Sequence, residues 1–201
     1  MVSGSVITKF VPVALAAALV VLPACSVNVK DKGKTGEGRV DINTPMGEIH
    51  VNEQPDVHDT GLSLYAGAKP APKDNGEDKK SANVNLSGFG FSLRVVASEF
   101  VSDDSPDKIL SYYNKELQRF GKPIECHGKW TGGDVDTDMH AQGDKDSSKP
   151  VSCRKDEGGD SVELKVGTVD NQHIVAVKPE GKGTHFALVY VRTHSGKDNT
   201  I

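Results

Sequence analysis

Two pairs of strand-like segments, each joined by a short glycine-containing turn, constrain the fold more than any other feature. One pair, 83–86 and 91–100, is separated by a turn with two glycines. The other pair, 174–177 and 186–191, has its turn at 180–183. Short β-branched and alternating segments between turn residues are typical of strands. Connections this short force neighbouring strands to be antiparallel.

One helix is predicted at 105–120, between the two strand pairs. Ser105 suits the N-cap, Pro106 the first helical position and Gly121 the left-handed position after the last turn. Apolar residues recur there at helical spacing and predict a buried stripe, made of Ile109, Tyr113, Leu117 and Phe120. The sequence therefore predicts an α+β fold, an antiparallel sheet of about five to seven strands with one main helix packed on one face.

Residues 1–24 have the pattern of a signal peptide and are excluded from the folded domain. Lys9 supplies a short positive region, and an apolar run follows from 10 to 22. This run of about 13 residues fits the apolar core of a signal peptide and is shorter than the roughly 20 residues that a spanning helix needs. No second apolar run of that length occurs, so we expect no transmembrane helix.

The leader ends in Leu22-Pro23-Ala24-Cys25, which resembles the lipobox of bacterial lipoproteins. In that family the chain is cut just before the cysteine and the thiol carries a diacylglyceryl group, so the resemblance implies lipidation at Cys25. In lipoproteins of this type from bacteria with two membranes, an aspartate after the cysteine favours retention in the inner membrane. Ser26 stands there, which implies the periplasmic face of the outer membrane. An ordinary secretory signal followed by a free Cys25 is the other interpretation.

The rest of the chain divides by composition. Polar, glycine-containing residues 25–39 predict a flexible tether between lipid and domain. Alternation at 40–60 about a Pro-Met-Gly turn predicts a short hairpin. Because an isolated hairpin is marginal in water, it must pair with the main sheet or stay mobile. Residues 61–193 are expected to form a single α+β domain, and 194–201 a disordered tail.

Three cysteines are present, and lipidation of Cys25 would leave Cys126 and Cys153 as an even pair. In an oxidising compartment such a pair predicts a disulfide. The bridge would close a polar loop and stabilise the fold by about 3.5 kcal/mol in the chain-entropy model. The alternatives are two free thiols or a Cys/His metal site that includes His127.

Composition and motifs exclude several classes of function. The formal net charge of −4 gives no electrostatic basis for nucleic-acid binding. The string Gly33-Lys34-Thr35 imitates the end of a phosphate-binding loop, but Asn28 stands where that loop needs its first glycine. No Gly-x-Ser-x-Gly nucleophile motif occurs. We therefore predict a protein that is not an enzyme and uses no cofactor.

An acidic segment imitates the start of a calcium loop. Asp134, Asp136 and Asp138 alternate as calcium ligands do. Met139 then replaces the glycine that the turn requires, and Lys145 replaces the bidentate glutamate. A solvated acidic loop without a metal is the favoured interpretation.

Five further side chains carry both a functional and a structural interpretation. His50 and His58 flank a proline, and two surface histidines are favoured over a metal pair. Trp130, in the loop that the disulfide would close, marks either an interface or packing onto that disulfide. Tyr112 and Tyr113 form either a binding face or part of the core, and the helical spacing favours the core.

Two stretches resemble a group of bacterial envelope proteins. Residues 62–68, Leu-Ser-Leu-Tyr-Ala-Gly-Ala, are similar to the Leu-Pro-x-Tyr-Pro-Gly-Ala segment of that group. Residues 102–117 are similar to its Asp-Ser-Pro-x-Lys-Val segment and to the Phe-Tyr-x-x-x-Leu helix that follows. The group has no established activity or catalytic residues, so the resemblance implies no particular reaction.

These observations favour a lipid-anchored protein of the cell envelope with a non-enzymatic structural or protein-interaction role. The expected partners are the membrane, through the lipid on Cys25, and an envelope protein. The alternative is a periplasmic binding module that takes a small ligand or a polymer on its sheet. An enzyme is the third possibility.

Overall fold

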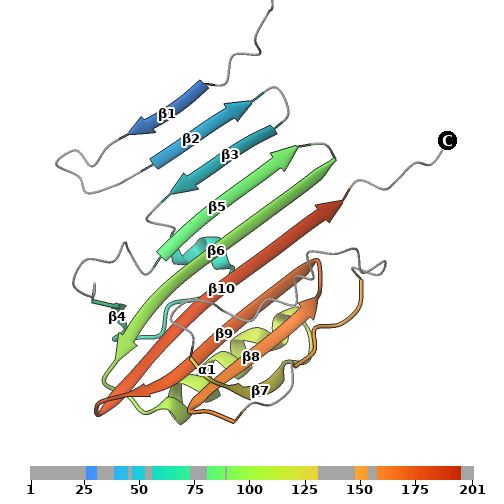
Figure 1. Ribbon diagram of the computed structural model, residues 1–201. Helices are drawn as coiled ribbons and strands as arrows, with labels where there is room; N and C mark the ends of the chain where they lie inside the picture. The colour runs from blue at the N-terminus through green and yellow to red at the C-terminus, as the bar shows by residue number, and fades with distance from the viewer. Residues whose placement is uncertain are drawn as a thin grey trace, which may run out of the picture.

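A single antiparallel sheet forms the framework of the protein (Figure 1). The computed structural model describes the residues 26–30, 39–44, 47–52, 56–72, 81–88, 90–130, 148–153 and 158–195. The strand order is β1-β2-β3-β5-β6-β10-β9-β8-β7, and the short β4 pairs with β6 outside this path. The α+β class and the antiparallel sheet predicted from the sequence are confirmed.

Most elements of the described chain are strands. The strands are β1 (Ser26–Lys30), β2 (Arg39–Thr44), β3 (Gly47–Asn52), β4 (Lys69–Pro70), β5 (Ser81–Gly88), β6 (Phe91–Ser102), β7 (Ile124–Gly128), β8 (Ser161–Thr168), β9 (Asn171–Glu180) and β10 (Gly183–Ser195). The helices are α1 (Pro106–Leu117) and the 3-10 helices η1 (Val57–Thr60) and η2 (Gln118–Phe120).

The sheet has ten strands, so the expectation of about five to seven is wrong. Ser26–Lys30, expected to be a tether, forms the edge strand β1 and pairs with β2. The hairpin expected at 40–60 is β2 and β3, and β3 pairs with β5. A sheet edge presents unpaired backbone N–H and C=O groups, and a strand added at that edge forms hydrogen bonds with them. The sheet therefore begins at Ser26, well before residue 61.

The C-terminal end also extends further than expected. Strand β10 continues to Ser195, which pairs with Phe91 of β6. The disordered tail was expected from residue 194. Residues 196–201 lie outside the described part of the chain.

The main core lies between α1 and the last strands of the sheet. Helix α1 packs across β8, β9 and β10, and leaves the N-terminal strands uncovered (Figure 1). The buried residues of this core are Leu62, Phe100, Ile109, Tyr113, Leu117, Leu164, Val166, Val175, Val177, Phe186 and Leu188. This packing confirms the helix on one face of the sheet.

Strands β9 and β10 are buried on both faces. A second apolar cluster lies on the side away from α1 and comprises Ile174, Ala176, Ala187, Val189 and Val191. A strand covered on both sides needs apolar residues at successive positions. This explains why 174–177 and 186–191 are continuous apolar runs and show no alternation.

Helix α1 begins where the sequence predicts and ends differently. Ser105 is the N-cap residue, although its side chain makes no capping hydrogen bond, and Pro106 is the first helical residue. After Leu117 the chain tightens into η2, which rotates Phe120 off the buried stripe. Phe120 is therefore 37% exposed, and the prediction that it is a buried core residue is wrong. Gly121 follows at a φ of 137°.

Candidate functional site

The predicted lipid-attachment site lies next to the first strand. Cys25 and the leader lie outside the described residues, and Ser26 is the first residue of β1. Ser26 pairs with Asn43 of β2, so the backbone is already part of the sheet one residue after the predicted lipid. Among the described residues, no helix is both long and apolar enough to cross a membrane.

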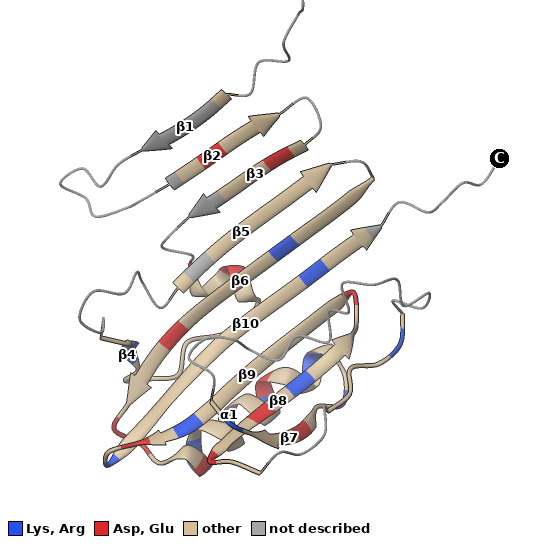
Figure 2. Ribbon diagram, in the orientation of Figure 1, with Lys and Arg blue, Asp and Glu red and all other residues tan. Residues whose placement is uncertain are grey.

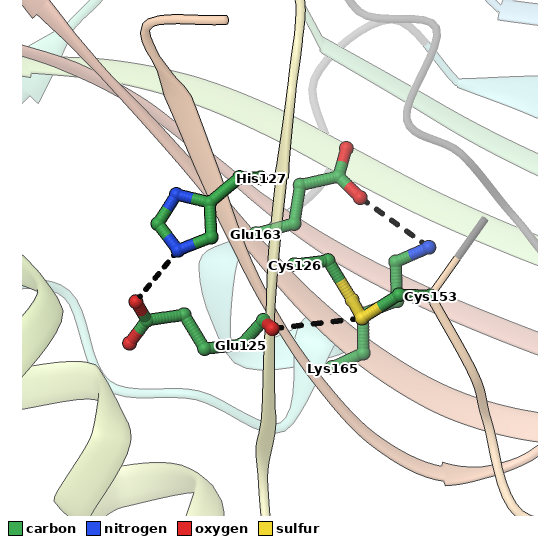
Figure 3. Close-up of a disulfide and its surroundings, with 6 residues drawn as sticks. All are labelled: Glu125, Cys126, His127, Cys153, Glu163 and Lys165. Atoms are coloured by element: carbon green, nitrogen blue, oxygen red, sulfur yellow. Dashed lines mark hydrogen bonds and ion pairs between the residues drawn. A yellow bond between two sulfur atoms is a disulfide. The ribbon is translucent and has the colours of Figure 1, made fainter. Parts of the chain in front are cut away.

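Cys126 and Cys153 are joined in a disulfide, as the cysteine count predicts (Figure 3). Their Cα atoms are 5.4 Å apart, within the usual range for such bonds. Cys126 is buried on β7, the edge strand at the opposite end of the sheet from β1. The bond therefore fastens the segment at 148–153 to an edge strand.

Two ion pairs surround the disulfide (Figure 3). The ammonium of Lys165 lies 3.3 Å from the carboxylate of Glu163, and the Lys165 side chain is only 1% exposed. The Nε2 atom of His127 lies 3.1 Å from the carboxylate of the more exposed Glu125. His127 therefore pairs with a carboxylate, and the cysteine next to it forms the disulfide.

A buried histidine between two carboxylates is the most unusual polar cluster of the described chain. Nε2 of His185 lies 2.7 Å from Glu99, and Nδ1 lies 2.6 Å from Glu180. His185 is 2% exposed, whereas half of the Glu180 side chain reaches solvent. A neutral imidazole has only one N–H, so both hydrogen bonds require an imidazolium or a protonated carboxyl group.

Sequence reasoning missed this cluster because its members are distant in the chain. The register of β6 and β10 places Glu99 opposite Ala187, on the same face as His185. The hairpin between β9 and β10 then brings Glu180 to the other side of the ring. No spacing between these three residues would have indicated the contact.

Trp130 covers the cluster. Its ring centroid lies 5.0 Å from that of His185, and the Lys178 ammonium lies 5.0 Å from the Trp130 ring. The sequence suggested that Trp130 either marks an interface or packs onto the disulfide. The structure instead places Trp130 against His185 and the second apolar cluster.

A small polar pocket opens beside Glu180. Its volume is about 240 Å³, and its lining includes Lys69, Ser102, Asp103, Glu180, Lys182 and Thr184. Pockets for drug-sized ligands usually measure about 300–1,000 Å³, so this one suits a small polar molecule at most. Glu180 belongs to both the pocket and the His185 cluster, so a ligand here would lie next to the carboxylate that contacts the buried histidine.

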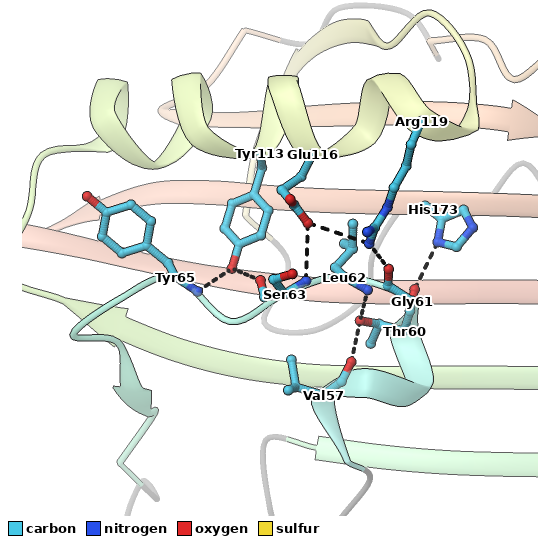
Figure 4. A network of polar contacts seen from close by, with 10 residues as sticks. All are labelled: Val57, Thr60, Gly61, Leu62, Ser63, Tyr65, Tyr113, Glu116, Arg119 and His173. Atoms are coloured by element: carbon cyan, nitrogen blue, oxygen red, sulfur yellow. Dashed lines mark hydrogen bonds and ion pairs between the residues drawn. The ribbon is translucent and has the colours of Figure 1, made fainter.

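A second polar network joins α1 to the segment after η1 (Figure 4). The Tyr113 hydroxyl donates to the carbonyl of Ser63 and accepts from the backbone N–H of Tyr65, at 3.2 and 3.1 Å. The Glu116 carboxylate accepts from the N–H of Ser63, and Arg119 donates to the carbonyl of Gly61. Tyr113 is fully buried in the core, which supports the structural interpretation of this tyrosine.

His173 ends this network on the sheet. Its Nδ1–H donates to the carbonyl of Thr60 at 2.9 Å, and its ring stacks on Phe120 with centroids 3.7 Å apart. Burial lowers the pKa of His173, despite the opposing effect of the Thr60 carbonyl. The folded protein therefore holds a neutral imidazole here.

Acidification should weaken the fold through His173. Because the folded pKa is lower than the unfolded one, this residue stabilises the fold above pH 6.5, and the contribution is lost as the pH falls through the folded pKa. Each pKa unit between the folded and the unfolded state corresponds to about 1.4 kcal/mol of unfolding free energy. Urea unfolding between pH 7.5 and 5 should show a steeper loss in the native protein than in a His173→Asn variant. The exposed His58→Asn is the matched control, and equal slopes in all three proteins would contradict the prediction.

His50 and His58, which flank a proline in the sequence, lie on the different elements β3 and η1. His50 lies between Asp41, at 2.7 Å, and Glu48, at 3.4 Å, whereas His58 lies in η1. The hydrogen bond to Asp41 is the main cause that raises the pKa of His50. Its contribution to stability is therefore lost as the pH rises, opposite in sign to that of His173, which is why the pH experiment compares variants.

Metal ligands are the last class of predicted site. Asp134, Asp136 and Asp138 lie outside the described residues. Within the described ranges, no three His, Cys, Asp or Glu side chains gather so as to hold a metal ion.

Comparison with protein-family models, curated proteins and solved structures finds no match to this chain. Function is therefore inferred from its own residues.

Proposed function

We propose that this protein is a lipid-anchored protein of the cell envelope, with a non-enzymatic role in structure or protein interaction. The observation that carries the proposal is the apolar leader that ends in Leu22-Pro23-Ala24-Cys25. A diacylglyceryl group on Cys25, with a second acylation at the new amino group, would hold the chain stably, because each buried methylene contributes about 0.8 kcal/mol.

The disulfide supports an extracytoplasmic location. Cys126 and Cys153 are bonded in the fold, and such bonds persist mainly in oxidising compartments. Ser26 after the predicted lipid attachment favours the periplasmic face of the outer membrane in bacteria with two membranes. The leader that ends at Cys25, the serine at position 26 and the disulfide all support a location outside the cytoplasm.

A binding module is the second candidate function, and the pocket beside Glu180 favours it. A small polar ligand would meet Lys182 and the Glu180 carboxylate, which in turn holds His185. This candidate differs from the first in its partner, a small molecule in place of a protein.

Crosslinking in the protein's own host separates these candidates. The mature lipidated protein, crosslinked with formaldehyde in intact cells and then purified, should carry one reproducible envelope protein. Crosslinking after detergent solubilisation is the control and should give none. If instead native mass spectrometry finds a co-purified small molecule that a Glu180→Gln variant lacks, the binding module replaces the first candidate. Absence of both would contradict the proposed role.

A further inference from the structure

The N-terminal strands have one polar and one apolar face. On the side of α1, the cross-strand row Asp41, His50, Asn85 and Arg94 is polar. On the opposite side, one cross-strand row consists of large aliphatic residues, which are Ile42, Ile49, Leu86 and Leu93. We call these four residues the aliphatic row. A second row behind it contains Val40, Val84 and Val95.

Charges are segregated away from the aliphatic row. Figure 2 shows few charged positions on β2, β3, β5 and β6. By alternation Asp41, Glu48 and Arg94 point to the polar face. Arg94 lies 2.8 Å from Asp59 of η1, which packs on that same polar face. Of the charges on these four strands whose side chains are described, only Glu99 shares the side of the aliphatic row, far along β6, where it binds His185.

The four residues of the aliphatic row are partly buried by their neighbours in the sheet, and the described chain places no helix on them. Strands β2 and β3 contact chiefly their neighbouring strands, and α1 lies on the other face beneath β8, β9 and β10. Phe91, two residues from Leu93 on the same face, is 41% exposed. An exposed apolar face rimmed by polar residues marks an interaction site or a membrane contact.

The register places Phe91 at the same end of the sheet as the predicted lipid. Ser26 is aligned with Asn43, Glu48, Ser87 and Ser92 across the sheet. Phe91 lies one position beyond this line, at the end of the sheet where β1 begins, and Cys25 is the residue before Ser26 in the sequence. Four strand spacings of about 4.8 Å separate β1 from β6, so Ser26 and this end of β6 are about 19 Å apart.

We propose that the aliphatic row and Phe91 rest on the surface of the lipid bilayer that holds Cys25. This docking rests on the proposed lipid anchor. No tether intervenes between Cys25 and β1, so the anchor holds this end of the sheet at the membrane. A weak apolar contact is then sufficient, because attachment makes the docking step intramolecular.

The area of the face argues against a second copy as the occupant. The two rows and Phe91 cover on the order of 400 Å². Two facing copies would bury about 800 Å², below the roughly 1,200 Å² of a stable interface. The net charge of −4 also offers no attraction to anionic lipid, so the contact is apolar and should be insensitive to salt.

Fluorescence quenching by lipid tests the docking. The mature lipidated protein, purified from its host, is reconstituted into phosphatidylcholine vesicles with brominated acyl chains. Phe91→Trp adds an emitter at the exposed position of the apolar face. Ser87→Trp, at the same end of the sheet but on the polar face, is the matched control. The parent protein with Trp130 alone gives the baseline.

The added emission of Phe91→Trp should be lost in brominated vesicles, at low and high salt, whereas that of Ser87→Trp should remain. If both persist in protein that floats with the vesicles, the docking is wrong and the anchor stands. If both are lost, the contact is not specific to one face and the proposal is also overturned. A crosslinked dimer with unquenched Phe91→Trp would identify a second copy as the occupant. Protein that does not float with the vesicles would overturn anchor and docking together.

Discussion

Replacing Cys25 with alanine is expected to abolish membrane attachment. The leader ends at this residue, and its thiol is the proposed site of the diacylglyceryl group. In cells labelled with radioactive or alkyne-tagged palmitate, native protein should be labelled and found in the membrane fraction. The Cys25→Ala variant should carry no label and accumulate as uncleaved or soluble protein. The effect is all or none, because a single residue carries the whole anchor.

Ser26 supplies the matched controls for this experiment. Ser26→Ala keeps the cysteine and should remain labelled and attached. Ser26→Asp should also remain labelled but move to the inner-membrane fraction if the protein is sorted by the residue after the lipid. Fatty-acid label that persists on Cys25→Ala would contradict the proposed anchor. Loss of label from Ser26→Ala would show that the assay does not report acylation of the cysteine.

Removing the disulfide is expected to cost about 3.5 kcal/mol of unfolding free energy, from the loop that it closes in the unfolded chain. Cys126 and Cys153 are 27 positions apart, and the bond ties the segment at 148–153 to the edge strand β7. In a Cys126→Ser/Cys153→Ser variant, the urea midpoint should fall accordingly and Tm should drop by about 10 °C.

Reductant provides the internal control for the disulfide. Dithiothreitol should lower the stability of the native protein towards that of the double variant, and should leave the double variant unchanged. Peptide mapping without reductant should find the peptides of Cys126 and Cys153 linked. Equal stability of the native protein with and without reductant would refute the prediction.

Local sequence patterns predicted the elements well where the neighbours in space are also neighbours in the chain. The hairpins at 83–100 and 174–191 became β5–β6 and β9–β10, because short turns leave only one antiparallel pairing. The start of α1 at Pro106 followed from capping and from proline geometry, which act within one turn. Phe120 was misplaced because helical spacing assumes that the helix continues unchanged through its last turn.

Composition was a poorer guide to the N-terminal strands. The polar residues 25–39 suggested a tether, yet 26–30 is an edge strand. A strand with one face in solvent can be as polar as a linker, and what separates them is a partner with a free backbone edge. That partner, β2, begins only at Arg39, so no local sequence pattern indicates its pairing with β1.

The sequence by itself determined the antiparallel class of the sheet, the position of its helix and the pairing of Cys126 with Cys153. These depend on periodicity, on turn length and on a count of thiols, all of which can be read along one chain. Tertiary structure alone decided that Glu99 and Glu180 meet His185, and that Ile42 and Leu93 share one face of the sheet with Phe91. Such contacts depend on the register between strands distant in sequence, and register is fixed by the packing of the whole sheet.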